Sequence, residues 1–542
     1  MSRPSDHIDS PAPSPVTQPA LGPVGYLRFF WRQLTSMRTA LLLLLLLAVA
    51  AVPGSLFPQR SSDPNGVIQY FDKNPASAPV LDGLQLFDVY TSVWFSAIYL
   101  LLFISLIGCV IPRTTHHLRA LRGRPPRTPA RLERLSVFVE VDAAGQDPAV
   151  AIDSARSMLR KSGYRAELFD GPTLSVSAER GYLRETGNLV FHTALIGILI
   201  SVGIGGGFGY TGQKVLVEGQ AFANVRLSYD SLNPGRFFSE STLPPYRIVL
   251  DDFSATYEEE NRNALGQPID FSADVTTYEG DGPGTKSTIK VNEPLRLDGN
   301  DIYLLGNGYA PSITVRDPEG EVVFSDQVPF LPSDANLTSL GVVKVPDGLA
   351  EQVGMAGFFY PTAAQLDTGA LTSNHPDLQN PVLTLRVYKG DLGIDGGIAK
   401  SVYNLDTDEL TAIAGDGAEE KALELRPGQT ADIPGGLGTV AFDNKDPDAD
   451  DLLQSVSRFA SLDVHRDPTQ GWVLFFAILV LLGLLTGLFI PRRRVWVKAV
   501  ETSEGLRLEY AGLARGDDPG LEAAVTDIAR RHSQQLGLKL SP

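Results

Sequence analysis

Apolar residues are gathered into four long blocks along the chain, at 39–57, 90–111, 188–204 and 472–490. Each block has about 17–22 residues, the length of helix that crosses ~30 Å of hydrocarbon at ~1.5 Å per residue. Further apolar blocks follow the first one, so we interpret it as a retained span rather than a signal peptide. The pattern predicts an α-helical membrane protein with four transmembrane helices.

The residues before the first block divide into two parts. Residues 1–22 are rich in Pro, Ser and Ala, which predicts a disordered tail. In 27–38, aromatic residues are interspersed with basic ones, as in Phe29, Phe30, Trp31 and Arg32. Such a mixture is typical of a helix that lies on the membrane surface. We therefore expect 1–38 to form a tail and an interfacial helix.

Between the third and fourth blocks, residues 205–471 alternate short β-patterned runs with turns of Gly, Pro, Asn and Asp. This alternation predicts a large β-rich, sandwich-like domain of antiparallel strands, with runs at 246–250, 287–291, 301–305, 312–315, 382–388 and 438–442. Segments 112–187 and 491–542 each combine strand-like runs with one helical pattern, at 148–161 and 520–536. They predict two small α/β pieces, and whether these pack together stays open.

Lysine and arginine near the ends of the blocks predict the orientation, because cytoplasmic loops carry an excess of both. Basic residues, nearly all of them arginine, are frequent before the first block, after the second, before the third (Arg180 and Arg184) and after the fourth, whereas loop 58–89 has only Arg60 and Lys73. We therefore expect a plasma (inner) membrane protein with both termini and 112–187 in the cytoplasm. Segments 58–89 and 205–471 are expected to be extracytoplasmic. The outer region 205–470 holds 18 Lys and Arg against 41 Asp and Glu, a net charge of −23.

Composition and missing motifs exclude several classes of protein. The net charge of −17 argues against binding to nucleic acid, which needs a basic surface. Cys109 is the one cysteine, so no disulfide forms within the chain. The sequence contains no CxxC or CxxCH, no G-x-S-x-G, no P-loop and no H-E-x-x-H. We therefore expect no enzymatic activity from this chain alone.

His192 is the most informative single residue, since it lies one to two turns inside the third block. An ionisable side chain within a span is costly and marks a functional site by default. A neutral imidazole in apolar surroundings is a good axial ligand for haem iron. A histidine in a span also hydrogen-bonds to neighbouring helices and specifies their packing. The residues alone leave both interpretations open.

Two further residues are candidate ligands. Cys109 lies in the second block at a depth similar to that of His192, and thiolate is a haem ligand, although cysteine also packs as a small hydrophobe. His465 lies just outside the fourth block. One interpretation is that it contacts haem or a partner there, and the other is that it is a solvated interfacial histidine. None of the four blocks contains a second histidine, so a second histidine ligand would have to come from another protein.

The order of the spans and several local runs resemble the ResB family of cytochrome c biogenesis proteins, the system II route. The resemblance covers most of the chain. The runs that carry it are GSLFPQ at 54–59, FDVYTSVWF at 87–95, CVIPR at 109–113, GYLRE at 181–185, VFH at 190–192, VNEPL at 291–295 with IY at 302–303, and DPTQGW at 467–472.

The resemblance implies that the chain handles haem across the membrane and promotes its covalent attachment to the CxxCH motif of apocytochrome c. It implies a ResC-like membrane partner with a tryptophan-rich segment, and a thioredoxin-like reductant that keeps thiols reduced. Haem b would be held transiently, with His192 as the family's intramembrane ligand and a partner histidine as the second. The chain would then be one necessary half of a haem-ligating synthase. The alternative is a cofactor-free envelope scaffold or sensor whose outer domain binds a protein or ligand.

Overall fold

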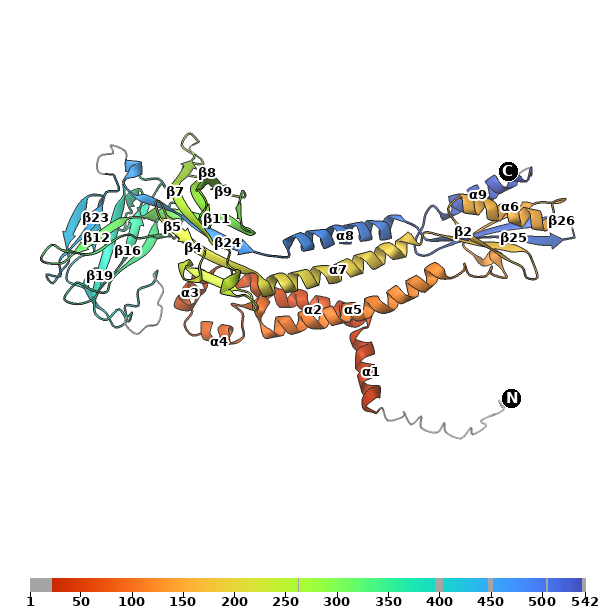
Figure 1. The fold of residues 1–542 in the computed structure, drawn as a ribbon, viewed down its shortest axis with the longest axis horizontal. Helices are drawn as coiled ribbons and strands as arrows, with labels where there is room; N and C mark the ends of the chain where they lie inside the picture. The colour runs from red at the N-terminus through yellow and green to blue at the C-terminus, as the bar shows by residue number, and fades with distance from the viewer. Residues whose placement is uncertain (1–21, 262, 395–402, 447–451, 504, 539–542) are drawn as a thin grey trace, which may run out of the picture. The chain divides into compact units, whose positions relative to one another are not determined.

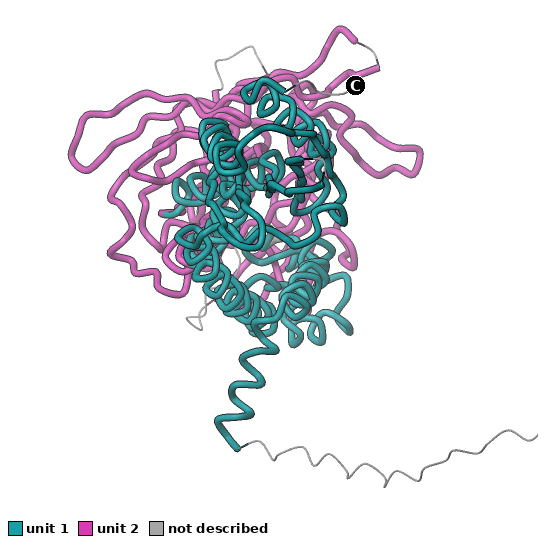
Figure 2. Tube along the Cα trace, turned by 90° about the vertical axis from the view of Figure 1, so that its right-hand side faces the viewer, with its two compact units in different colours: residues 1–203, 469–542 teal, residues 204–468 magenta. Residues whose placement is uncertain are grey.

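The computed structural model describes residues 22–538 apart from 262, 395–402, 447–451 and 504. The chain divides into two compact units, residues 1–203 with 469–542 and residues 204–468 (Figure 2). The predicted disordered tail falls on residues 1–21, outside the described residues.

Within the described residues, four helices are long and apolar enough to cross a membrane: α2 (Met37–Leu56), α5 (Val93–Arg122), α7 (Leu183–Phe208) and α8 (Gln470–Phe489). Serine side chains cap two of them, because Ser36 accepts from Thr39 N at 3.2 Å and Ser92 accepts from Phe95 N at 3.2 Å. The shorter helices of this unit outside the α/β domain are α1 (Pro23–Leu34), α3 (Pro64–Lys73) and α4 (Ala78–Gly83). The chain is thus a multi-pass membrane protein, and the four predicted spans are confirmed.

The helices differ in detail from the apolar blocks. Helix α5 runs beyond Ile111 to Arg122, because its polar final turns contact α7. The third apolar block ends at residue 204, whereas α7 continues through the glycines at 205–207 to Phe208. The carbonyl of Gly207 accepts a hydrogen bond from Phe237 N at 2.8 Å, so a folded segment supports this end of the helix. Loop 58–89 contains α3 and α4, which the pattern did not predict.

The two segments predicted as small α/β pieces form one domain. A five-stranded antiparallel sheet has the order β1-β26-β25-β3-β2, so strands from both segments are interleaved. Helices α6 and α9 pack on this sheet and on each other over one apolar core (Figure 1). The elements are β1 (Val137–Asp142), α6 (Pro148–Lys161), β2 (Arg165–Phe169), β3 (Ser175–Arg180), β25 (Arg493–Thr502), β26 (Gly505–Ala514) and α9 (Leu521–Gln535).

The second unit is β-rich and has two main cores. One core includes Leu216, Ile248 and Leu462, and lies between two sheets, β10-β11-β24-β4-β6 and β5-β7-β8-β9. The strands are β4 (Tyr210–Val217), β5 (Ala221–Ala223), β6 (Ser231–Pro234), β7 (Tyr246–Tyr257), β8 (Pro268–Glu279), β9 (Thr285–Lys290), β10 (Leu295–Leu297), β11 (Asn300–Ala310) and β24 (Ser457–Arg466).

The other core includes Phe359 and Phe442, and it lies between the sheet β13-β12-β23-β22 and a six-stranded sheet built around β15, β16 and β19. The pairing between named strands is antiparallel throughout the unit, as sandwiches require. The predicted fold class is confirmed. The strands are β12 (Ser312–Arg316), β13 (Val322–Gln327), β14 (Leu331–Pro332), β15 (Ser339–Val345), β16 (Val353–Tyr360), β19 (Val382–Lys389), β20 (Thr411–Ala414), β21 (Leu423–Leu425), β22 (Gln429–Asp432) and β23 (Thr439–Asp443), with β17 (Ala363–Gln365) and β18 (Leu371–Ser373) as a separate pair.

Candidate functional site

A cavity of about 750 Å³ lies between α5, α7 and α8, where these helices reach the α/β domain. Part of its wall is apolar and comes from the three helices: Val110, Pro112, Leu189, Phe191, Leu484 and Leu488. The rest is polar or charged, with three arginines, three histidines, one glutamate and one asparagine: Arg113, Arg184, Arg515, His116, His117, His192, Glu185 and Asn188. Such a mixture of apolar wall and convergent polar groups is typical of a ligand site.

Helices α7 and α8 cross with their backbones in contact beside this cavity. A Cβ added to Gly483 would lie 2.6 Å from the backbone nitrogen of Phe191, and one added to Gly187 would lie 2.8 Å from the carbonyl oxygen of Gly483. Small residues permit this close approach between helices in a membrane. The crossing therefore fixes which side of α7 faces the cavity.

His192 lines the cavity from α7, half-buried, with its ring edge-on to Phe191 at 5.0 Å between centroids. Its Nδ1 lies 2.7 Å from the carbonyl oxygen of Asn188, one helical turn earlier. A carbonyl only accepts hydrogen bonds, so this contact assigns the proton of the neutral ring to Nδ1. Nε2 then keeps its lone pair, which is the state of an imidazole that binds a metal.

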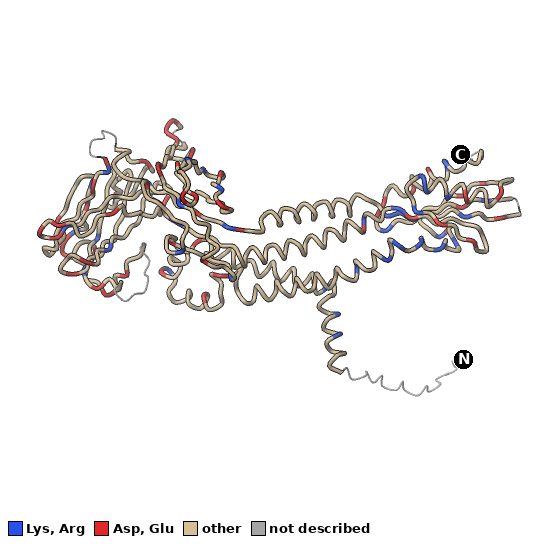
Figure 3. The backbone as a smooth tube through the Cα atoms, viewed as in Figure 1, with Lys and Arg blue, Asp and Glu red and all other residues tan. Residues whose placement is uncertain are grey.

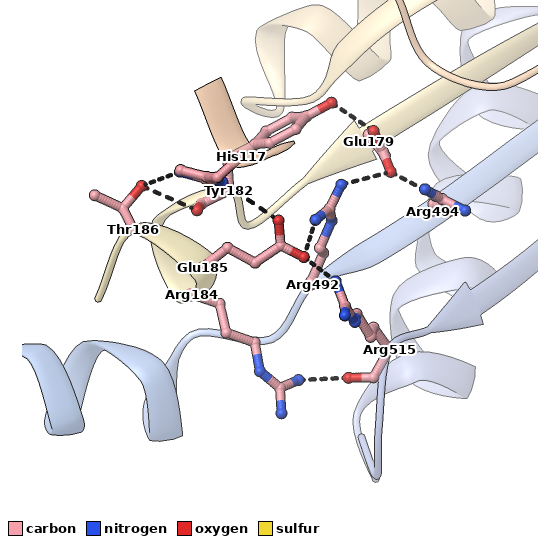
Figure 4. A network of polar contacts seen from close by, with 9 residues as sticks. All are labelled: His117, Glu179, Tyr182, Arg184, Glu185, Thr186, Arg492, Arg494 and Arg515. Atoms are coloured by element: carbon pink, nitrogen blue, oxygen red, sulfur yellow. Dashed lines mark hydrogen bonds and ion pairs between the residues drawn. The ribbon is translucent and has the colours of Figure 1, made fainter. Parts of the chain in front are cut away.

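An ion-pair network holds α7 to the α/β domain (Figure 4). Arg492 follows α8, is 7% exposed and lies between two carboxylates. Its guanidinium donates to Glu179 Oε1 of β3 at 3.1 Å and also pairs with Glu185 of α7. Glu179 accepts further hydrogen bonds from Tyr182 and Arg494. The start of α7 is thus tied to strands β3 and β25.

Glu185 extends the network to the cavity. It pairs with Arg515, which follows β26, and its Oε2 lies 3.4 Å from His117 Nδ1. The other ring nitrogen of His117 lies 3.0 Å from Thr186 Oγ1. His117 is buried, because α5 extends far enough beyond the second apolar block to pack on α7. Arg184 donates to the backbone carbonyl of Arg515.

Burial and hydrogen bonding act in opposite directions on the pKa of Glu179, the carboxylate of this network that lies in the α/β domain. Burial raises the pKa of Glu179, but the hydrogen bonds from Tyr182 and Arg494 lower it by more than burial raises it. The net pKa of Glu179 is therefore below its ordinary value. Burial, together with the hydrogen bond to Glu179, raises the pKa of Tyr182 to about 12. Glu179 therefore contributes stability above the ordinary pKa of a glutamate, and that stability is lost as the pH falls through its lowered value.

Cys109 lies on a different side of α5 from the cavity lining. Its Sγ is 2.9 Å from the carbonyl oxygen of Thr35, in the link between α1 and α2. The neighbouring Gly108 also faces this link, since a Cβ there would lie 2.0 Å from Thr35 Cγ2. Cys109 does not line the cavity around His192.

His465 belongs to β24 in the unit of residues 204–468. Its Nε2 lies 2.7 Å from Asp463 Oδ2, and its ring is edge-on to Tyr303 at 5.5 Å. The hydrogen bond to Asp463 raises the pKa of His465, although partial burial lowers it, and the net pKa is above the ordinary value. Its immediate partners are thus a carboxylate and a tyrosine within the β-rich unit.

Sequence reasoning identified His192 but missed the charged residues that share its cavity. Arg184 was interpreted only as an indicator of topology, and Arg515 was not singled out. The spacing of Arg184, Asn188 and His192 at intervals of four residues was a usable signal, because such residues share one face of a helix. No pattern along the chain signalled Arg515, which reaches the cavity from the α/β domain.

Residues 37–526 match the sequence profile of the ResB-like family. The chain is 27% identical over 491 residues to the cytochrome c biogenesis protein CcsB of Synechococcus sp. (strain RCC307), covering 89% of this chain and 91% of that protein. It is 24% identical over 505 residues to the protein of that name from Synechococcus sp. (strain WH7803), covering 92% and 96%. It is 28% identical over 489 residues to that of Prochlorococcus marinus (strain AS9601), covering 89% and 93%.

Proposed function

Because the chain belongs to the ResB-like family, we propose that it is a subunit of a system II cytochrome c assembly complex. In this role it handles haem and promotes the covalent attachment of haem to the CxxCH motif of apocytochrome c. The resemblance inferred from local runs of sequence agrees with the family match over most of the chain.

His192 carries the proposal, as the axial ligand of haem iron. Its Nδ1 is hydrogen-bonded to the Asn188 carbonyl, which orients the ring and leaves Nε2 for iron. The adjoining cavity has an apolar wall for the porphyrin faces. Haem iron in this setting needs only one or two protein ligands, and imidazole is a common one.

Haem b is the cargo of this site rather than a resident cofactor. We assign the second iron ligand to a histidine of a ResC-like membrane partner, which would also supply the tryptophan-rich segment. This chain has only four tryptophans. The thioether bonds form when each cysteine thiol adds its S–H across a haem vinyl group, so the thiols must arrive reduced. A membrane-bound thioredoxin-like protein would supply that reductant.

The distribution of charge supports an orientation for this role. Lys and Arg gather where the helices approach the α/β domain (Figure 3). Since positive residues favour the cytoplasmic side, we place both termini and the α/β domain in the cytoplasm, and the acidic β-rich unit outside. His192 then lies near the cytoplasmic side of the plasma (inner) membrane, and the β-rich unit is available to apocytochrome c.

An absorption spectrum tests the assignment. The chain is purified in detergent with its ResC-like partner, as wild type, as His192→Ala, and as His465→Ala for the matched histidine control. We expect a haem Soret band in the wild type and the control, its loss in His192→Ala, and its return when imidazole is added to that variant. Recovery by imidazole would show that the variant's site is folded. Equal haem in all three proteins would refute His192 as the ligand and leave it as a packing residue.

A further inference from the structure

We propose that Arg184 and Arg515 bind the propionate carboxylates of haem and thereby fix the orientation of the porphyrin in the cavity. The propionate edge would face the α/β domain, and the opposite edge would lie deeper among the helices. This inference rests on the proposed function, since it assigns an orientation to the same ligand at the same site.

The first observation is the spacing along α7. Arg184 and His192 both line the cavity, with Asn188 between them on the same face of the helix. Eight residues at ~1.5 Å per residue separate their backbones by about 12 Å along the axis. The cavity therefore offers an iron ligand at His192 and a carboxylate-binding group at Arg184, at two different depths. Haem needs this arrangement, because its iron is central and its propionates are at one edge.

The second observation is the balance of charge. The described lining residues include three arginines, Arg113, Arg184 and Arg515, and one carboxylate, Glu185. These leave a formal excess of two positive charges, which equals the negative charge of two propionates. Planar guanidinium groups bind carboxylates in a bidentate manner and with stronger hydrogen bonds than neutral donors. The excess favours a dianionic ligand over a neutral one.

The third observation is that each arginine has an anchoring contact, although the Arg515 side chain is 74% exposed. Arg515 pairs with Glu185, and Arg184 donates to the backbone carbonyl of Arg515. Each guanidinium has five N–H donors, so these contacts leave donors for a carboxylate. Glu185 is itself paired with Arg492, which is buried, so the α/β domain fixes the position of this charged end. A prepositioned pair of this kind selects one orientation of the porphyrin.

The test compares haem with its dimethyl ester, which keeps the iron but lacks free carboxylates. Both are titrated, with the Soret band as readout, into the purified complex with its partner in nanodiscs. We expect the wild type to bind haem at least tenfold more tightly than the ester. Arg184→Gln and Arg515→Gln should each bind haem about tenfold more weakly, the factor for one charge-assisted hydrogen bond, and should bind the ester as the wild type does. Arg184→Lys should recover part of the loss.

Arg119→Gln is the matched control, because Arg119 is an exposed arginine of α5 that does not line the cavity. It should behave as the wild type. Equal binding of haem and ester by the wild type, with a Soret band that still depends on His192, would overturn this inference and leave the proposed function intact. No haem binding by the wild type would overturn the proposed function itself. A preference for haem over the ester that persists unchanged in Arg184→Gln and Arg515→Gln would assign the propionates to other residues and also overturn the inference.

Discussion

Replacing Arg492 by methionine removes the cation between Glu179 and Glu185 and keeps a side chain of considerable length. Burial alone would lower the pKa of Arg492, but the two carboxylates raise it above its ordinary value, so the residue is charged at every accessible pH. Its guanidinium also lies over the ring of Tyr182, 4.9 Å from the centroid. The substitution therefore leaves two carboxylates without their shared partner.

Breaking a buried ion pair by removing one member costs about 3–5 kcal/mol. We expect a value near the lower limit, about 3 kcal/mol, because Glu179 keeps Arg494 and Glu185 keeps Arg515. For domains of 150–250 residues, 1 kcal/mol corresponds to a change of about 2–4 °C in melting temperature, so the expected decrease is about 6–12 °C.

Thermal unfolding in detergent measures this decrease through tryptophan fluorescence, to which Trp496, buried in the α/β domain, contributes. Arg530→Met is the matched control, because Arg530 pairs with Asp527 on the surface, where such a pair contributes about 0–1 kcal/mol. Adding Glu185→Gln to Arg492→Met removes one of the two stranded carboxylates and should recover part of the loss. Equal melting temperatures for Arg492→Met and Arg530→Met would refute the argument that the network stabilises this unit.

Three further predictions concern other parts of the same unit. Gly483→Ala places a Cβ against the α7 backbone and should destabilise the protein by about 1–3 kcal/mol and weaken the Soret band, whereas Gly471→Ala, with nothing within 4 Å, should change neither. Burial lowers the pKa of His532 to about 4, so its contribution of about 3 kcal/mol is fully present above pH ~6.5 and is lost as the pH falls towards 4. His532→Gln should flatten the unfolding free energy between pH 7 and 4.5, measured by denaturant titration, and an unchanged slope would contradict the assignment. Cys109→Ser should keep its hydrogen bond and the full Soret band of the complex, and loss of the band would restore cysteine as a candidate ligand.

The spans were predictable because each is a local property of about 20 apolar residues, but the ends of the helices were not. The second apolar block ends at Ile111, whereas α5 continues to Arg122 and brings His117 against Glu185 and Thr186. Polar residues in those last turns carry no hydropathy signal, and tertiary contacts determine that they stay helical.

The α/β domain shows the same limit at larger scale. Strand-like runs and helical patterns identified its elements separately, and α6 begins and ends where the pattern placed it. The pairing of β25 with β3 joins residues far apart in the chain, and neither strand signals its neighbour. Arg515 could not be predicted either, because it reaches the cavity through a contact between distant parts of the chain. His192 was recognisable because an ionisable residue in an apolar block is a local anomaly.

The order of strands in that domain has a consequence for how the protein is made. β25 and β26 occupy the centre of the sheet but leave the ribosome after α7, the whole β-rich unit and α8. Before β25 and β26 are synthesised, β1 lacks its one neighbour, β26, and β3 lacks its inner neighbour, β25. Apolar residues that are buried in the finished domain, such as Val176, are then exposed beside unpaired backbone groups. A chain interrupted before β25 would thus present an open sheet edge to chaperones and proteases. The sheet of the α/β domain can therefore close only after the β-rich unit and α8 have been synthesised.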